Sequence, residues 1–242
     1  MGEIESALAA MARARGVGES IANRDVQSYA AWGSGVIYAL AGEWEAGVDA
    51  CRRGVELSPD PLTRALASAS LGYAYLEKGE ASQAIPLLEQ AVQRMSQFRW
   101  RQLQGWFAAC LSEAFRLNGQ IDKARELALQ GLGIGRDAGF GYAVGLSQRA
   151  LGRIAQARSA FPEAESYLNE ALQTFGSMQA RLEAGRTHLA LAELGHARGD
   201  REALASHLKE AHQQFKVLRV PKHVERTEQL ARKLGVSLSS EG

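Results

Sequence analysis

The same arrangement of small and apolar residues returns about every 40 positions along this chain of 242 residues. One column holds a small residue and advances by 37, 40, 40 and 40 positions, at Gly35, Gly72, Ser112, Gly152 and Ala192. A second column keeps the same steps at Gly42, Gly79, Gly119, Ser159 and Gly199. A fixed period of this length indicates supersecondary units that stack, because one unit alone cannot bury its apolar surface.

Each copy of the repeat has the pattern of two helices joined at a turn. Around Gly79, apolar residues recur three and four positions apart, as in Leu71 and Tyr75 before it and Ala84 and Leu88 after it. This is the spacing of a helical stripe. Gly79 itself fits the position just past a helix end, where a left-handed backbone is favoured. The sequence therefore predicts an all-α solenoid of antiparallel helix pairs.

The repeated residues resemble those of the tetratricopeptide repeat (TPR) family, and the pattern is carried here by Leu71, Gly72, Tyr75, Gly79, Ala84 and Ala91. The resemblance covers about five repeats, at residues 28–64, 65–104, 105–144, 145–184 and 185–218. It implies one right-handed superhelical domain over residues 1–242, in which the first helix of each pair lines a concave groove that binds ligands. Residues 105–235 also resemble the repeat arrays of large bacterial signalling proteins, where the array follows an ATPase module and often a nucleotide cyclase or a DNA-binding regulator domain.

Both ends of the chain extend the repeat pattern. Residues 3–16 keep the register of a second helix that has no first helix before it, so we expect an orphan helix and the tail of a longer protein. The charged segment 221–235 is expected to form a helix that caps the last pair. Apolar Leu8, Ala9 and Met11 on the orphan helix suggest a homodimer through the terminal helices.

Composition and charge exclude several classes of partner. The net charge of +1 lacks the basic footprint of a nucleic-acid-binding protein. No apolar run reaches the roughly 18 residues that span a bilayer, so we expect no membrane partner. The two cysteines, Cys51 and Cys110, are too few for a disulfide scaffold and indicate a reducing, cytoplasmic setting. Both occupy columns otherwise filled by leucine or alanine, which predicts small apolar fillers.

The sequence contains no recognisable catalytic or cofactor motif. The stretch GIGRDA at 133–138 mimics a dinucleotide-binding loop but follows a helix rather than a strand, so close helix packing is the favoured interpretation. The five histidines form neither HExxH nor a zinc-type cluster. No nucleophile or acid–base pair stands out. We therefore expect no enzyme activity, no cofactor and no metal.

The concave face is the candidate binding site. Helical spacing relative to the Gly72 column predicts an inward stripe of Tyr29, Trp32, Val36, Tyr73, Trp106, Glu113, Arg116, Arg149, Arg153, Gln156, Arg186, Glu193 and His196. This groove would be aromatic at its N-terminal end and basic further on, where Arg149, Arg153 and Arg186 could grip a carboxylate or phosphate. An equally weighted alternative is that these arginines only keep a helical surface soluble.

Two functions remain open on this basis. The first is a non-catalytic module that acts as a regulatory segment of a larger bacterial signalling protein. It would bind a protein or an extended peptide, and an acidic or carboxylate-bearing partner is one option. The alternative is a sensor for a small ligand or a peptide pheromone, whose superhelix changes shape on binding.

Overall fold

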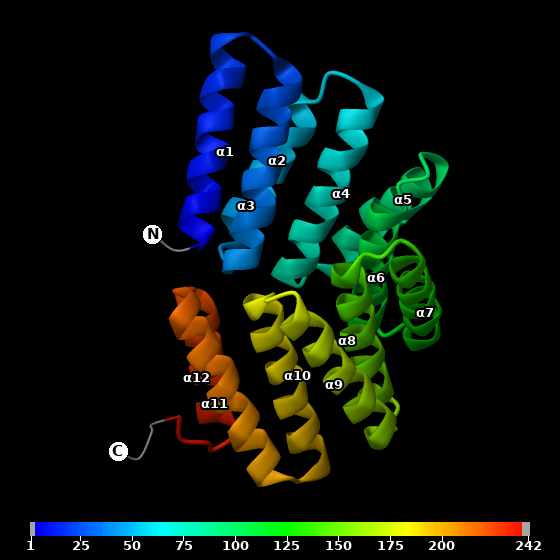
Figure 1. Cartoon of the computed structure of the whole chain (residues 1–242), viewed down its shortest axis with the longest axis vertical. Coiled ribbons are helices and arrows are strands. Elements are labelled where there is room, and N and C mark those ends of the chain that lie inside the picture. Colours follow the sequence, from blue (N-terminus) through cyan, green and yellow to red (C-terminus); the bar gives the residue numbers. More distant parts are fainter. Residues whose placement is uncertain (1–2, 239–242) are drawn as a thin grey trace.

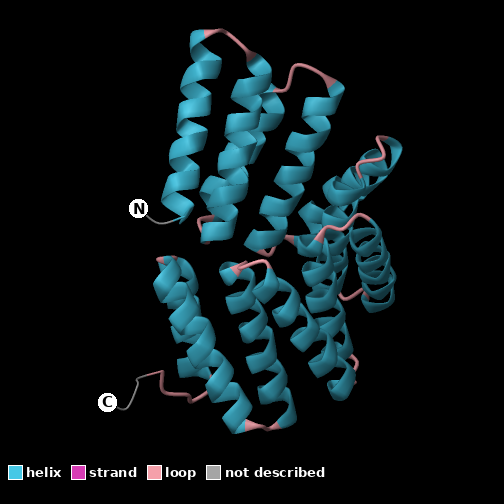
Figure 2. Ribbon diagram, in the orientation of Figure 1, coloured by secondary structure: helices cyan, strands magenta, loops and turns pink. Residues whose placement is uncertain are grey.

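The computed structural model describes residues 3–238, and these residues form twelve α-helices and no strand (Figures 1 and 2). In chain order the helices are α1 (Glu3–Ser20), α2 (Arg24–Ala41), α3 (Trp44–Leu57), α4 (Pro61–Lys78), α5 (Ala81–Gln97), α6 (Arg101–Leu117), α7 (Ile121–Asp137), α8 (Gly141–Ala157), α9 (Phe161–Ser177), α10 (Arg181–Arg198), α11 (Arg201–Leu218) and α12 (Pro221–Lys233). None of the described helices is both long and apolar enough to cross a lipid bilayer. The prediction of an all-α solenoid of helix pairs is confirmed.

The turn column marks the ends of the first helices. Gly42 and Gly79 lie in the left-handed region, with φ of 89° and 88°. There the Gly79 amide donates to the Leu76 carbonyl and the Glu80 amide donates to the Tyr75 carbonyl, which satisfies two of the last carbonyls of α4. Ser159, which replaces glycine in this column, keeps the same conformation with φ of 58°. The recurrence in the sequence therefore reflects a left-handed backbone conformation shared by the five turns of this column.

A third repeating column is the buried contact between paired helices. Its members lie on the second helix of each pair and are 0% exposed: Cys51, Leu88, Ala128, Leu168 and Leu208. Small residues on the first helix let the two backbones approach, since a Cβ added at Gly35 would lie 2.8 Å from the Gly47 carbonyl oxygen. The prediction that Cys51 is an apolar filler is confirmed, and burial raises the pKa of its thiol to about 12.

The 40-residue step extends further than the five predicted pairs. Helices α4, α6, α8, α10 and α12 begin at residues 61, 101, 141, 181 and 221. The segment expected to be a cap is thus a helix in the register of a first helix. At the other end, α1 runs to Ser20 rather than to residue 16, and the Met11 sulfur would lie 2.8 Å from a Cβ added at Gly33 of α2. Met11 is thus half-buried against α2, and a homodimer through the terminal helices stays a prediction.

The two ends of the solenoid meet. The C-terminal ends of α2 and α4 face the N-terminal ends of α10 and α12 (Figure 1). His223 Nε2 donates to the Leu40 carbonyl oxygen over 2.8 Å, and Arg186 forms an ion pair with Glu77. Ile4 of α1 packs against the cluster formed by Ala211, Phe215 and Val220. We call this set of contacts the seam.

The Leu40 contact has a simple physical origin. The last carbonyls of a helix have no partner within it. In α2 the carbonyls of Tyr38 and Ala39 accept from the turn that follows, whereas the next one, Leu40, is free to accept from outside. His223 of α12 donates to this carbonyl, so a residue near the C-terminal end of the array caps a helix near its N-terminal end.

Candidate functional site

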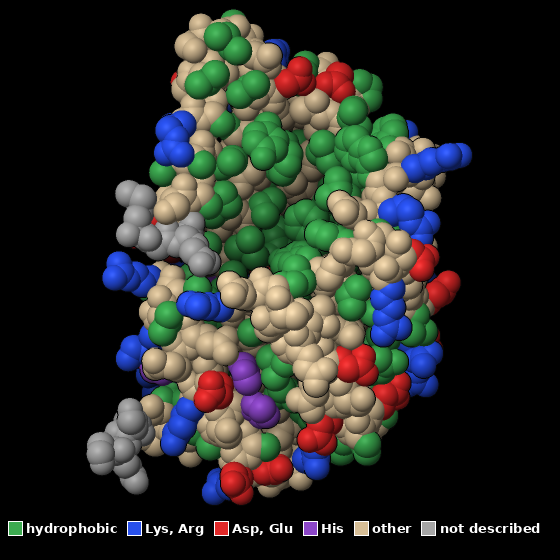
Figure 3. Space-filling view, viewed as in Figure 1, with side chains coloured by type: hydrophobic (Ala, Val, Ile, Leu, Met, Phe, Trp, Pro, Cys, Tyr) green, Lys and Arg blue, Asp and Glu red, His purple; other side chains and the backbone are tan. Residues whose placement is uncertain are grey.

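A cavity of about 770 Å³ lies at the centre of the concave side. Its wall comes almost entirely from the first helices, α4, α6, α8, α10 and α12, with Trp44 of α3 added at the seam. Figure 3 looks onto the hollowed face, where hydrophobic side chains gather between the N-terminal and the C-terminal helices. Closure at the seam therefore converts an open groove into a partly enclosed chamber.

The cavity wall carries more cations than carboxylates. The cationic side chains are Lys78, Arg116, Arg149, Arg153, Arg186, Arg226 and Lys233, and the carboxylates are Glu77, Glu113 and Glu193. Glu183 lies directly behind this surface and is 3% exposed. Two networks of ion pairs, one around Glu113 and one around Glu183, decide which of these charges remain available.

Glu113 of α6 holds two arginines. Its carboxylate accepts from Arg116 on the same helix with two contacts of 2.8 Å, and from Arg153 of α8 over 2.7 Å. Glu113 and Arg153 are 40 residues apart, so the repeat step itself stacks them on neighbouring helices. Burial raises the pKa of Glu113, but Arg153 and Arg116 outweigh that effect and bring it to about 2. Glu113 is therefore ionised.

Glu183 of α10 holds a second set of partners. Its carboxylate lies 2.6 Å from Arg149 and 3.3 Å from Arg186, and it accepts from the Tyr142 hydroxyl over 3.2 Å. Arg149 also donates to the Glu183 backbone carbonyl over 3.1 Å. Arg186 continues across the seam to Glu77 of α4. One buried network thus ties the inner helices of the two halves together.

These pairings limit which charges of the groove are available to a ligand. Arg149, Arg153 and Arg186, the residues predicted to be able to grip a carboxylate or phosphate, each already have a carboxylate partner. The cavity cations without an ion pair to any described residue are Arg226 and Lys233, both on α12. The unpaired cations of the cavity therefore lie on the helix that was predicted to be a cap.

The structure brings about half of the predicted stripe together. Around the cavity lie Tyr73, Glu113, Arg116, Arg149, Arg153, Arg186 and Glu193. Gln156 lies beside Arg116, Arg153 and Glu193 in a second, smaller hollow of about 390 Å³. The residues outside both hollows are Tyr29, Trp32, Val36, Trp106 and His196.

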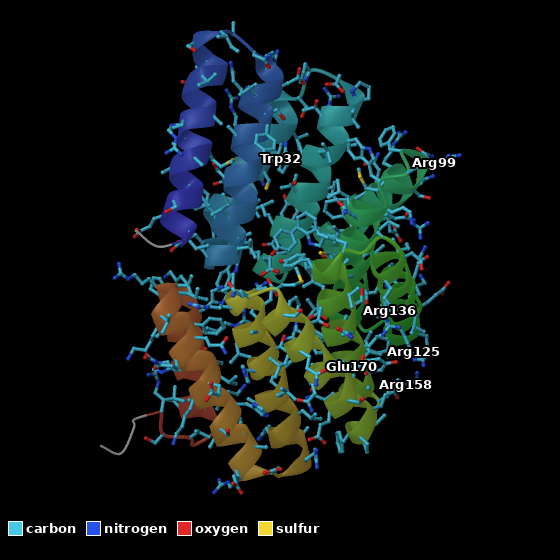
Figure 4. The ribbon with its side chains drawn as sticks, in the orientation of Figure 1. Trp32, Arg99, Arg125, Arg136, Arg158 and Glu170 are labelled. Atoms are coloured by element: carbon cyan, nitrogen blue, oxygen red, sulfur yellow. The ribbon has the colours of Figure 1, made fainter. Side chains whose placement is uncertain are left out.

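The N-terminal aromatics form a separate surface. Tyr29 is 49% exposed and meets Trp32 edge-to-face with ring centroids 4.9 Å apart, while Trp32 and Val36 pack on the main core. In Figure 4, Trp32 lies on α2, whereas Arg125, Arg136 and Arg158 lie at the outer edge of the array. None of these three arginines lines the cavity.

Sequence reasoning missed five residues that shape the site: Trp44, Glu77, Glu183, His223 and Arg226. A usable signal existed for two of them. Glu77 lies one helical turn after Tyr73, and Arg226 lies one 40-residue step after Arg186. Trp44 and His223 depend on how the superhelix closes, whereas Glu183 depends on how α10 packs against α8.

The wall shows little that could act as a nucleophile or hold a metal. Cys110 is buried at the cavity, and burial raises the pKa of its thiol far above the ordinary range. His188 and His207 approach through their Nδ1 atoms over 3.1 Å, but no cluster of three or more His, Cys, Asp or Glu side chains suited to a metal occurs among residues 3–238.

Comparison with known proteins shows the fold. No family model matches the sequence, and no curated protein matches it either. Among solved structures, a Rap protein complexed with Competence and Sporulation Factor has a TM-score of 0.75 at 12% identity, over 92% of this chain and 64% of that one. This chain therefore spans less than two thirds of that Rap protein's length.

Two further structures have the same architecture. Aspartyl phosphate phosphatase F from Bacillus subtilis gives a TM-score of 0.62 at 8% identity, over 90% of this chain and 59% of that one. A signal transduction ATPase with a tetratricopeptide repeat sensor from Pyrococcus horikoshii gives 0.58 at 18% identity, over 83% of this chain and 31% of that one. The structure is a TPR-like α-solenoid of the kind found in Rap proteins and in the repeat arrays of signalling proteins.

Proposed function

We propose that this chain is a non-catalytic interaction module that binds a protein or an extended peptide in the cavity on its concave side. The observation that carries the proposal is the cavity wall, because successive first helices contribute one continuous surface of apolar and charged side chains. Preformed concave sites of this kind suit ligand binding, since the polar groups are already positioned. The closed networks around Glu113 and Glu183 hold that surface rigid.

The similar structures support this proposal at the level of architecture. The Rap protein was solved with a bound factor, and the repeat array of the Pyrococcus protein is described as a sensor. We extend the proposal for this chain to a cytoplasmic, regulatory role within a larger bacterial signalling protein. The small share of the Pyrococcus protein that this chain covers is in keeping with such a role.

The second candidate function is a sensor for a small ligand or a peptide pheromone. The volume of about 770 Å³ favours it, because small-molecule pockets typically hold about 300–1,000 Å³. The seam favours it as well, since ligand binding inside the chamber and contact across the seam would affect each other.

Filling the cavity should abolish ligand binding. Leu146 of α8 is half-buried at the cavity wall, so Leu146→Trp places an indole in the chamber. For peptides selected from a displayed library on the unaltered protein, we expect this variant to weaken binding at least tenfold in calorimetric titration. The matched control is Leu129→Trp, because Leu129 is 39% exposed on the outer helix α7. Peptides that bind both variants equally well would place the binding surface elsewhere.

A further inference from the structure

We propose that the cavity takes an organic anion, whose acidic group is held by Arg226 and Lys233 of α12 while its apolar body lies against the inner helices. This inference rests on the proposed function and adds the chemistry of the ligand. It also assigns the main ligand contact to the helix that closes the solenoid.

No carboxylate contacts the Arg226 guanidinium directly, although Glu193 of the same cavity is near enough to attract it. Arg226 forms no ion pair with any described residue, and its guanidinium lies over the Trp44 ring, 5.9 Å from the centroid. Partial burial lowers its pKa, the neighbouring cations Arg186 and Arg153 lower it further, and Glu193 offsets only part of this effect. A positive charge crowded by other positive charges is stabilised by an anion brought between them. Guanidinium is well suited to this contact because it can bind carboxylate with two parallel hydrogen bonds.

Helix α12 presents its cations along one line. Arg226, Leu230 and Lys233 are spaced by four and three residues, which places them on one helix face, and all three line the cavity. Lys233 likewise has no ion pair to a described residue. The cavity-facing side of α12 thus carries two positive charges without ion pairs, and an apolar residue lies between them.

Two further hydrogen-bond donors at the cavity wall have no acceptor in the structure. The Tyr73 hydroxyl belongs to a side chain that is 3% exposed; Arg186 lies close enough to donate to its oxygen, but its own O–H has no acceptor. Arg153 Nε is also buried without a partner, although Nη1 of the same side chain contacts Glu113. Buried polar groups are almost always hydrogen-bonded, so unpartnered donors on a cavity wall point to a bound acceptor.

The apolar residues of the cavity wall determine what the rest of the ligand is like. Leu76, Leu146 and Leu230 line the cavity together with Trp44. An inorganic ion would leave this apolar surface uncovered, whereas an organic anion covers it and gains from its burial. The matching ligand is therefore an acid carried on an apolar group, such as the free carboxyl end of a peptide or a small apolar carboxylic acid.

The test uses two fluorescent probes that differ by one charge. Anilinonaphthalene sulfonate has an acidic group on an aromatic body, and phenylnaphthylamine has the same rings without the acid. We expect the folded protein to bind the sulfonate more tightly. Arg226→Gln should weaken the sulfonate about tenfold, as expected for the loss of one charged contact, and should leave the neutral probe unchanged. Arg226→Lys should retain most of the affinity.

The matched control is Arg232→Gln, which removes the same charge from an exposed position of α12 outside the cavity. If Arg226→Gln fails to fold by circular dichroism, Lys233→Gln serves in its place, because Lys233 is exposed and unpaired. Equal binding of the two probes, or equal effects of the cavity and control variants, would overturn the proposal. Such a result would leave the Leu146→Trp test untouched, so failure of the anion site and of the binding function can be told apart.

Displacement of the sulfonate tests whether the bound acid is a carboxylate on an apolar body. N-acetyl-leucine carries a free carboxylate, and its amide does not. Displacement by the acid at a lower concentration than by the amide supports recognition of a carboxyl end. Displacement by inorganic phosphate as effective as that by N-acetyl-leucine would contradict an organic ligand.

Discussion

Replacing Glu183 by glutamine should lower the free energy of unfolding by about 3 kcal/mol. Glu183 is 3% exposed and pairs with both Arg149 and Arg186, whose side chains are only 11% and 15% exposed. Loss of its charge leaves two buried cations with a reduced set of partners, and removing one member of a buried pair costs far more than the pair itself contributes. The measurement is urea unfolding of the purified protein at neutral pH.

Glu165→Gln is the matched control for this substitution. Glu165 pairs with Arg198 on the outside of the array, and both side chains are more than a third exposed. Exposed pairs of this kind contribute less than about 1 kcal/mol. Equal losses of stability in the two variants would show that the buried Glu183 network stabilises the fold no more than an exposed ion pair does.

Acidification should weaken the seam before it affects the carboxylates. His223 is 3% exposed, and burial together with the nearby Arg186 and Arg226 lowers its pKa to about 4. The folded protein therefore binds a proton here less readily than the unfolded chain does, for which the ordinary pKa is 6.5. The stabilising contribution is complete above pH 6.5, declines as the pH falls from there, and is lost near pH 4. It amounts to about 3 kcal/mol in all, of which about 2 kcal/mol is lost by pH 5.

Comparison with His223→Gln isolates this contribution. Groups facing His223 are the Leu40 carbonyl of α2, Arg186 of α10, the Phe215 ring of α11 and Arg226 of α12, so no carboxylate contacts it to offset protonation. Between pH 7.5 and 5, the unaltered protein should lose about 2 kcal/mol more stability than the variant. Parallel pH profiles would show that His223 does not sense pH.

The sequence predicted the helix pairs because their determinants are local and periodic. The column of Gly42 and Gly79 marks a left-handed turn, and the column of Cys51 and Leu88 marks the buried contact. Both features repeat with the helices, so the register alone reveals them. Continuing that register one step further would also have placed Arg226 beside Arg186 on the inner face.

The closure of the solenoid could not be predicted in this way. Arg186 and Glu77 are 109 residues apart, and their contact depends on the accumulated rotation of every pair between them. The same applies to His223 and Leu40, which are 183 residues apart. The predicted stripe included Glu113 with its partners Arg116 and Arg153, but it missed Glu77 and Glu183, which pair with Arg149 and Arg186. Glu183 lies one turn from the stripe and reaches Arg149 only in the packed structure.

The central claim is that the two ends of the solenoid meet and enclose the cavity. Pulsed electron paramagnetic resonance between spin labels at Glu43→Cys and Lys222→Cys tests it directly, because both positions are exposed and adjoin the seam. Native Cys51 and Cys110 are buried with raised thiol pKa values, so they should resist labelling. We predict a single narrow distance at the short limit of the method. A long or broad distribution in the unliganded protein at neutral pH would contradict the closed solenoid.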